Sequence, residues 1–324
     1  MTSKALRTII GLAFIAVIGF ALTACNNEAE RTADTSNINN TTNATSETSS
    51  NANNASDTST SATTGEITVI TREDGSGTRG AFVEIVDITI EGNDNITVEA
   101  VVAPGTSVMM TNVAENPQAI GYASTGVALA DDRVRVLNVD GVAPTVENML
   151  SGTYAIQRPF IIGYNTDEGL SPLAQDFIDF IFSTQGQEVV AGRGYVPFVP
   201  TGAPEYTPSG QSGRIVVNGS SSVYSLMQHL SAAYRELNPD VEIDIHGAGT
   251  GHGISAVRDG LADIAMSSRD LRESELEFMS PLTIAIDGIA VIAHPSNPLE
   301  GLSLQQVRDI FLGELTRWEA IANE

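Results

Sequence analysis

The chain has 324 residues, with 40 acidic against 16 basic side chains and a formal net charge of −24. This charge disfavours a nucleic-acid ligand, because the phosphate backbone would be repelled. The single cysteine, Cys25, excludes a disulfide within one chain, so the fold must be held together by its hydrophobic core.

The first 24 residues have the pattern of a secretory signal peptide. Lys4 and Arg7 precede an apolar run from Ile9 to Leu22, which is short and wrongly flanked for a stable membrane-spanning helix. The run ends before Cys25 in a sequence that resembles the bacterial lipoprotein signal. We therefore expect diacylglycerol attachment at Cys25 rather than an unused free thiol, and an extracytoplasmic protein anchored to the cell membrane.

Residues 25–64 consist mainly of Asn, Thr, Ser and Ala with scattered acids. They contain too few large apolar side chains to offset the entropy of ordering, which predicts a disordered tether. A flexible segment of this length spans on the order of 35 Å. A glycosylated stalk is the alternative.

The segment 65–198 begins with a strand, a glycine-rich turn and a helix. The apolar run 67–70 predicts the strand, the sequence 72–79 predicts the turn, and the helix follows. Such a turn directs free backbone N–H groups and the positive end of the helix dipole at one point. With Arg72 it supplies almost only hydrogen-bond donors, which indicates an oxyanion site; an ordinary capped helix is the alternative.

Further elements follow in this segment. Val134–Leu137 is predicted to be a strand, 145–150 a short helix, and Ser171 the cap of a helix with Pro172 in its first turn. Residues 199–213 are rich in proline and glycine and are predicted to be a linker.

The segment 214–324 contains two more strand–turn–helix units, with turns at 218–222 and 246–253 that are rich in glycine and hydroxyl side chains. The apolar run 284–293 predicts a buried strand, and Ser303 with Gln306 forms a capping box. Strands alternating with helices over about 260 residues predict an α/β fold with largely parallel sheets, in two lobes rather than one.

The chain resembles the extracytoplasmic phosphate-binding proteins of ABC transporters. The segments that carry this resemblance are 72–79, 116–122, 194–197, 219–222, 247–251 and 263–269. The resemblance implies a two-lobed periplasmic-binding-protein-like fold of type II with a ligand cleft between the lobes. In the family, the segment similar to 214–324 precedes the one similar to 65–198, so the chain looks circularly permuted, with 199–213 joining the usual ends.

The resemblance also implies roles for individual residues. Arg72 would pair with phosphate oxygens and be held by Asp74. Donors would come from both lobes: Ser76, Gly77, Thr78, Ser221, Ser222 and Thr250. Some members have an aspartate at the position of Ser268, where it accepts a hydrogen bond from the phosphate proton. Without this acceptor the site should discriminate less against fully deprotonated anions. The lost discrimination is the cost of one unmade buried hydrogen bond, about 1–3 kcal/mol. Asp74 is the candidate for a substitute acceptor.

The lobes implied by the resemblance comprise 214–293 with 161–198, and 66–157 with 297–324. The chain would cross between them near 158–160 and near 294–296, forming a hinge. We expect a monomer that binds inorganic phosphate and a permease, without cofactor, metal or nucleic acid. A swapped dimer or a truncated tandem chain is the alternative.

Three other functions remain open from the residues alone. The first is a receptor for another tetrahedral oxyanion, and the second is a surface sensor or adhesion module without transport. An enzyme is disfavoured, because Ser76 does not lie in a nucleophile elbow and no histidines are spaced as metal ligands. His252, next to the third turn, is the only histidine expected near the proposed site.

Overall fold

The computed structural model describes residues 64–90, 93–199 and 202–321. All of them lie in one compact unit, Thr58–Glu324. The predicted signal peptide, Cys25 and the predicted tether up to residue 63 lie outside the described residues. In the part of the chain that is described, no helix has the length and apolar composition needed to cross a membrane.

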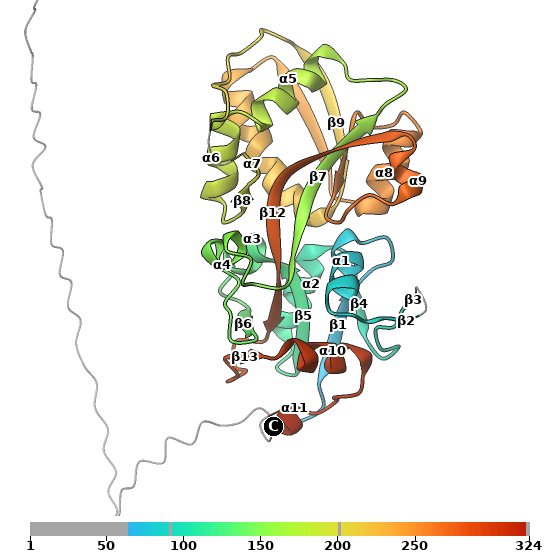
Figure 1. Ribbon diagram of the computed structural model, residues 1–324, viewed down its shortest axis with the longest axis vertical. Helices are drawn as coiled ribbons and strands as arrows, with labels where there is room; N and C mark the ends of the chain where they lie inside the picture. Colours follow the sequence, from blue (N-terminus) through green and yellow to red (C-terminus); the bar gives the residue numbers. More distant parts are fainter. Residues whose placement is uncertain (1–63, 91–92, 200–201, 322–324) are drawn as a thin grey trace, which may run out of the picture. The chain divides into compact units, whose positions relative to one another are not determined.

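The elements are grouped in two lobes, which we call lower and upper as they stand in Figure 1. The lower lobe comprises the described residues of 64–156 and 289–321. Its elements are β1 (Thr68–Arg72), α1 (Gly77–Ile85), β2 (Thr89–Ile90), β3 (Asn93–Asp94), β4 (Val101–Ala103), α2 (Thr106–Glu115), β5 (Ala119–Ser124), α3 (Thr125–Ala128), β6 (Arg135–Val139), α4 (Val146–Leu150), β13 (Gly301–Leu302), α10 (Leu304–Leu312) and α11 (Trp318–Ile321).

The upper lobe comprises the described residues between 160 and 285. Its elements are α5 (Pro172–Ile181), α6 (Thr184–Gly192), β8 (Val196–Pro197), β9 (Gly213–Gly219), α7 (Ser221–Leu237), β10 (Val241–His246), α8 (Thr250–Arg258), β11 (Ile264–Ser267) and α9 (Glu273–Leu276). Residues 202–212 form no helix or strand. The fold class, a two-lobed α/β architecture, is confirmed.

Two long strands, β7 (Gln157–Asn165) and β12 (Met279–Ala293), belong to both lobes (Figure 1). β12 pairs with β7 over Met279–Gly288 and then with β5 over Ile289–Ala293. The second crossing therefore lies near Gly288, and the expectation that it lies at 294–296 is wrong. The chain crosses inside a strand because β12 continues from Met279 to Ala293 while its partner changes from β7 to β5.

The sheet is mixed rather than largely parallel. β1 is parallel to β4 and β5, and β9 is parallel to β10 and β11. β12 is antiparallel to all four strands that it contacts, which are β5, β6, β7 and β8. The two crossing strands run in opposite directions between the lobes, so their pairing must be antiparallel.

The helix starts follow the capping chemistry that the sequence indicates. Ser171 caps α5 by accepting from the N–H of Ala174, and Pro172 occupies the first turn. Ser303 and Gln306 form the predicted capping box of α10. Both predictions are confirmed, because a serine oxygen satisfies an N–H group that has no partner within the helix.

Each lobe has an aromatic cluster in its core. In the lower lobe the rings of Phe82 and Tyr122 stack 4.0 Å apart, and Phe311 from α10 meets Phe82 edge-on. In the upper lobe Tyr234 lies among three other rings, those of Phe177, Phe180 and Tyr206. Tyr206 comes from the segment without regular structure, so this segment contributes to the core.

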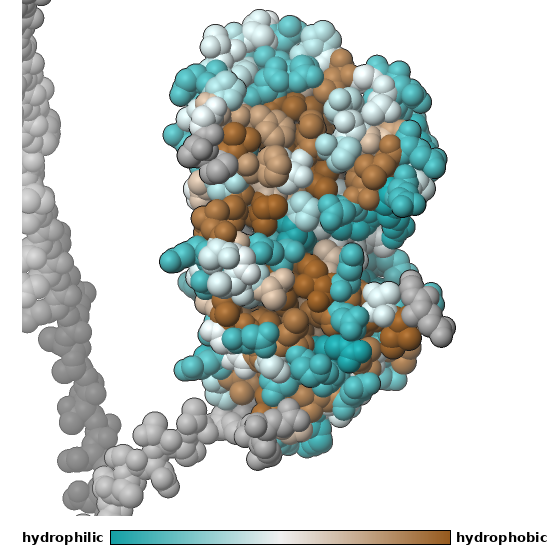
Figure 2. Space-filling view, viewed as in Figure 1, coloured by the Kyte–Doolittle hydropathy of each residue, from teal (hydrophilic) through white to brown (hydrophobic). Residues whose placement is uncertain are grey.

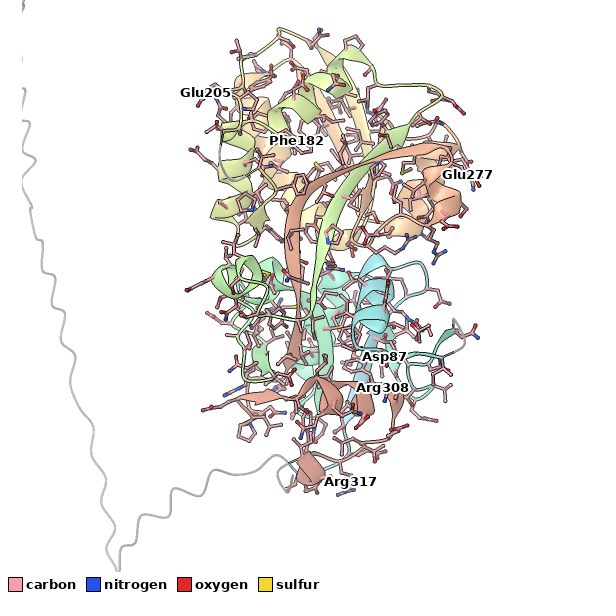
Figure 3. All side chains as sticks on the ribbon, in the orientation of Figure 1. Asp87, Phe182, Glu205, Glu277, Arg308 and Arg317 are labelled. Carbon is pink, nitrogen blue, oxygen red and sulfur yellow. The ribbon has the colours of Figure 1, made fainter. Side chains whose placement is uncertain are left out.

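The two ends of the described chain lie together in the lower lobe. The N–H of Ile67 donates to the carbonyl of Thr316 at 2.7 Å, and Glu66 and Arg317 form an isolated bridge. Further along, Arg308 Nε of α10 donates to the carbonyl of Asp87 at 2.8 Å, as can be followed in Figure 3. The last segment of the sequence therefore packs against the first segment of the described chain.

Candidate functional site

Four strands end in turns that lead directly into helices: β1 into α1, β4 into α2, β9 into α7, and β10 into α8. β1 and β4 are parallel neighbours in the lower lobe, and β9 and β10 are parallel neighbours in the upper lobe. Parallel neighbours end at the same edge of a sheet, where open α/β sheets bind ligands. Two helix N-termini from each lobe therefore meet at the boundary between the lobes.

Arg72, the last residue of β1, lies at the centre of this meeting point and is only 2% exposed. Its Nη2 donates to Ser221 Oγ of the upper lobe at 3.0 Å, and its Nη1 donates to Thr106 Oγ1 at 3.3 Å. Its Nε and Nη2 bind the two carboxylate oxygens of Glu73 at 2.8 and 2.7 Å. The guanidinium is thus fixed in a plane, with donors directed at hydroxyls of both lobes.

The hydroxyl groups of the two lobes contact each other beside Arg72. Thr78 Oγ1 lies 2.9 Å from Ser222 Oγ, and Thr106 Oγ1 lies 3.1 Å from Ser221 Oγ and 3.3 Å from Ser222 Oγ. We call these four side chains, Thr78, Thr106, Ser221 and Ser222, the hydroxyl cluster. All but Ser221 are buried. The cluster brings predicted residues 78, 221 and 222 together.

Ser268 and Thr250 complete the upper side of the site. Ser268 Oγ accepts from Ser220 Oγ at 2.8 Å, and the N–H of Ser268 donates to Thr250 Oγ1 at 3.4 Å. Ser220 is also the N-cap of α7. Both predicted residues are fully buried.

The first turn of α1 lies directly against these two side chains. A Cβ atom on Gly77 would come within 2.3 Å of Thr250 Oγ1 and 2.7 Å of Ser268 Oγ. Ser76 caps α1 by accepting from the N–H of Arg79. The lack of a side chain at Gly77 therefore allows the two lobes to approach.

Two of the four helices begin at a glycine instead of a capping side chain. Gly105 precedes α2 with φ +96°, and Gly249 precedes α8 with φ +106°; neither offers a side-chain acceptor to the helix N–H groups. Glycine is the residue that adopts such a φ without strain. The first N–H groups of these helices find partners across the site instead: Thr106 N–H donates to Ser221 Oγ at 3.3 Å, and Gly251 N–H donates to the carbonyl of Gly75. Such N–H groups, with no cap in their own helix, are suited to an anion, which also gains from the helix dipole.

The expectation that Asp74 holds Arg72 is wrong. The Asp74 side chain is 99% exposed and pairs with Arg79, whereas Glu73 holds Arg72. The residue next to the end of β1 can fold back along the guanidinium, but Asp74 lies one position further into the turn. Asp74 is thereby also unsuited to accept a phosphate proton at the hydroxyl cluster.

The electrostatic state of Glu73 follows from its neighbours. Burial alone would raise the pKa of this carboxyl, but hydrogen bonds and the charge of Arg72, with the N–H of Gly105, outweigh it and lower the pKa below the ordinary value. Glu73 is therefore ionised near neutral pH. The Arg72–Glu73 pair has no net charge, so the helix N-termini provide the remaining positive potential.

Sequence reasoning missed Thr106 and Glu73. The signal for Thr106 is present, because 101–107 reads as strand, Pro-Gly turn, hydroxyl side chains and helix, like the other three turns. Glu73 could not be distinguished from Asp74 by residue type. Their roles depend on the backbone path after β1.

An open groove of about 840 Å³ lies next to Ser76 and Gly251, between α1 and the segment 269–275. Its rim carries both signs of charge, from Asp74, Arg79, Glu84, Asp87, Asp94, Arg269, Asp270, Arg272 and Glu275. Figure 2 shows hydrophilic residues on the right of the boundary between the lobes, where this groove opens. The N–H of Gly251 donates to the carbonyl of Gly75 at 3.2 Å, at the inner end of the groove.

The site has no metal-ligating arrangement: within the described ranges no group of three or more His, Cys, Asp or Glu could hold a metal ion. His252, the histidine beside the third predicted turn, is exposed. The arrangement can donate many hydrogen bonds to a small anion enclosed between the lobes. Two lobes joined by two strands, with helix N-termini at their boundary, define the class of solute-binding proteins.

The comparisons with known proteins agree with this class. The family model of the PBP superfamily domain matches residues 29–185 and 204–323. The chain is 38% identical over 319 residues to the phosphate-binding protein PstS 2 of Streptococcus pneumoniae serotype 4, covering 97% of this chain and 99% of that protein. It is 41% identical over 265 residues to PstS 2 of Streptococcus agalactiae serotype V, covering 80% of this chain and 88% of the relative.

A solved structure is also similar. The phosphate-binding protein of a phosphate ABC transporter from Streptococcus pneumoniae TIGR4 matches with a TM-score of 0.63 and 42% identity, covering 79% of this chain and all of that structure. The chain therefore belongs to the PBP superfamily and, within it, to the family of the PstS phosphate-binding proteins.

Proposed function

We propose that this protein binds inorganic phosphate between its lobes, outside the cytoplasm, and delivers it to an ABC transporter. The observation that carries the proposal is the hydroxyl cluster, which unites Thr78 and Thr106 of one lobe with Ser221 and Ser222 of the other beside buried Arg72. The relatives in both streptococci are named as phosphate-binding proteins, which supports the same ligand here.

The binding step follows from the donors at the site. Phosphate would receive charge-assisted hydrogen bonds from Arg72 and hydrogen bonds from the hydroxyl cluster, Ser76, Thr250 and Ser268. The backbone N–H groups of Gly77 and of the glycine-capped helices α2 and α8 would add to them. The hydroxyls that now contact one another would exchange these bonds for bonds to the anion. Because donors come from both lobes, binding stabilises the closed arrangement.

A second tetrahedral oxyanion is a specific alternative. Glu73 is bound to Arg72 on both oxygens, and Asp74 points to solvent, so neither of these two carboxylates is directed at the hydroxyl cluster. A serine or threonine oxygen can accept the proton of HPO₄²⁻ in its place, but it can also donate to sulfate. The selectivity for phosphate therefore rests on how these hydroxyl protons are arranged.

We propose no catalysis at this site. Among the described residues no hydrogen bond joins a histidine to the hydroxyl cluster, and the carboxylate of Glu73 is engaged by Arg72 and Gly105. A hydroxyl nucleophile needs an adjacent base to lose its proton. Release of phosphate from a generic phosphate ester by the purified protein would contradict this assignment.

We also propose that residues 1–24 are removed as a signal peptide, that Cys25 carries a lipid, and that 26–64 tethers the body to the membrane. The composition of these segments supports this, although residues 1–63 lie outside the described residues. A Cys25→Ser variant should be found in the culture medium instead of the membrane fraction. Retention of this variant in the membrane would refute the anchor.

We further propose that the order of the two segments is circularly permuted relative to other family members, and that the protein is a monomer. The ends of the described chain share hydrogen bonds, Ile67 N–H to Thr316 and Trp318 N–H to Gly65. Adjacent ends allow the order of segments to change without altering the core. The pneumococcal relative aligns over nearly its whole length, as a shared segment order predicts. Light scattering at monomer mass is expected; a stable dimer would contradict a closed single chain.

The decisive experiment is calorimetric titration of residues 26–324 with inorganic phosphate, with sulfate as the control anion. We expect tight one-to-one binding of phosphate, weaker binding of sulfate, and loss of tight binding in Arg72→Ala. Tight sulfate binding would shift the assignment to the alternative oxyanion. Unchanged phosphate affinity in Arg72→Ala would refute the assigned site.

A further inference from the structure

Arg158 and Asp287 face each other at the point where both crossing strands pass between the lobes. They are register partners on β7 and β12. Ile156, the residue before β7, belongs to the core of the lower lobe, and Phe160 on β7 belongs to that of the upper lobe. On β12, Ile289 already belongs to the lower core. The pair therefore lies at the strand crossing, between the two hydrophobic cores.

The pair is an ion pair without access to water. The side chains are 1% and 0% exposed, and Arg158 Nη2 lies 3.1 Å from Asp287 Oδ2. Asp287 Oδ1 accepts from Ser124 Oγ and Thr125 Oγ1, both at 2.9 Å. These two hydroxyls come from the end of β5 and the start of α3, so Asp287 is fixed by the lower lobe.

The remaining arm of Arg158 reaches into the upper lobe. Its Nη1 donates to the carbonyl oxygen of Ser268 at 3.2 Å. Ser268 in turn contacts Ser220, the cap of α7, and Thr250, the first residue of α8. A continuous series of hydrogen bonds thus leads from the lower lobe, through the strand crossing and Ser268, to the first residues of two site helices, α7 and α8.

Burial makes this arrangement costly. It disfavours both charges, lowering the pKa of Arg158 and raising that of Asp287, and the field of Arg72 also acts on Arg158. An apolar pair of similar volume often gives equal or greater stability than a buried ion pair. What apolar side chains would lack is direction: the planar guanidinium offers donors to Asp287 on one side and to Ser268 on the other.

We propose that Arg158 is a positioning residue for the anion site, which holds the Ser268 turn in its binding geometry while Asp287 fixes Arg158 to the lower lobe. This inference rests on the proposed phosphate site. Arg158 acts on anion binding through Ser268. It strengthens binding only when the two lobes have the relative orientation that brings the hydroxyl cluster together.

The test uses a variant that removes both charges, Arg158→Met with Asp287→Asn, because removing one partner alone would leave the other charged and buried. Calorimetric titration of residues 26–324 should show a phosphate Kd raised about tenfold, the effect of one lost buried hydrogen bond. The melting temperature without phosphate should stay within a few degrees of the wild type. A residue with a merely structural role would change the melting temperature and leave Kd unaltered.

The matched control is Arg135→Met. Arg135 Nε also donates to a backbone carbonyl, that of Leu299 at 2.9 Å, but on the far side of β12 from the hydroxyl cluster. The same substitution there should leave the phosphate Kd within twofold of the wild type. A tenfold weakening in the control as well would overturn the inference, because the effect would then not depend on Ser268.

A second variant covers the case in which the double variant does not fold. Arg158→Lys keeps the charge opposite Asp287 but cannot reach both partners with a planar fork, so its Kd should lie between those of the wild type and the tenfold-weakened protein. If the folded variants bind phosphate with a Kd within twofold of the wild type, the inference about Arg158 is overturned but the proposed function is not. Absence of binding by the wild type overturns the proposed function, and the inference with it.

Discussion

Gly77 shows how a single missing side chain sets the distance between the lobes. Its backbone lies where any Cβ would overlap Thr250 Oγ1 and Ser268 Oγ, at 2.3 and 2.7 Å. Both of these atoms belong to fully buried side chains with partners of their own, so they cannot move aside freely. The close approach of α1 to the upper lobe therefore depends on this glycine.

Gly77→Ala should weaken phosphate binding about tenfold to a hundredfold, the cost of overpacking a tightly packed contact. Stability without phosphate should change little, because the open arrangement removes the clash. Gly80→Ala in the same helix is the matched control, since its Cβ would only touch Arg269 at 3.4 Å. Calorimetric titration of both variants with phosphate measures the difference. Equal phosphate affinities of the two variants would mean that the lobes do not close as described.

Glu73 leads to a prediction about pH. Its pKa is lowered in the folded protein, so its stabilising effect is complete above the pKa of the unfolded chain, 4.5, and is lost as the pH falls through the lower folded value. Glu73→Gln should therefore lower the melting temperature at pH 7, and the difference from the wild type should shrink below pH 4. Thermal melts between pH 3 and 7 test this, and a constant difference would contradict it.

The sequence predicted that the turns carrying Arg72, Thr78, Ser222 and Thr250 would converge on one candidate site, because glycine-rich turns after strands have a recognisable composition, and the structure brings these turns together. The sequence could not choose between Glu73 and Asp74, since both are acids and only the backbone path after β1 separates them. The role of Gly77 was expected to be an N–H donor. Its steric role depends on atoms almost 200 positions away in the sequence.

At the level of elements, β12 determines the relation between the two lobes. Its apolar composition indicated a buried strand over 284–293, but the strand extends from Met279 to Ala293 and pairs with strands in both lobes. Composition cannot reveal where a strand exchanges one partner for another, because both environments are apolar. The position of the crossing was therefore predicted wrongly, whereas the capped helices α5 and α10, whose signals are local, were predicted correctly.

Residues 202–212, which precede β9, are held in place by Tyr206. Its hydroxyl donates to Asp176 Oδ2 at 2.6 Å and accepts from Asn238 Nδ2 at 3.0 Å, while Tyr234 donates to the same Asp176 oxygen. Asp176 belongs to α5, Tyr234 belongs to α7, and Asn238 is the residue that ends α7. A segment that was expected to be a simple linker is thus attached to two helices of the upper lobe.

Tyr206→Phe should lower the free energy of unfolding by about 1–2 kcal/mol, because Asp176 and Asn238 lose a buried partner. Phosphate affinity should not change, since Tyr206 lies away from the hydroxyl cluster. Tyr224→Phe is the control: the Tyr224 hydroxyl accepts only from exposed Gln228, and its loss should stay within about 0.5 kcal/mol. Urea unfolding of both variants measures the difference; equal stabilities would mean that the segment is not held by this hydroxyl.

At the scale of the whole molecule, the sign of the charge is unfavourable for capturing an anion. The chain carries −24, and removal of residues 1–24, with Lys4 and Arg7 and no acid, gives −26. The groove beside the site has more carboxylates than guanidiniums on its rim. Affinity must therefore come from the enclosed donors, and the surrounding charge should act mainly on the rate of encounter.

The association rate of phosphate should accordingly rise with ionic strength, by about two- to fivefold between low and physiological salt, because salt screens the repulsion beyond about 8–10 Å. The dissociation rate should stay nearly constant, since Arg72 and the hydroxyl cluster are shielded from solvent. Stopped-flow measurements at several concentrations of potassium chloride would separate the two rates. A falling association rate would mean that Arg79, Arg269 and Arg272 create a locally positive entrance, so that the rim of the groove, and not the net charge, controls the approach of the anion.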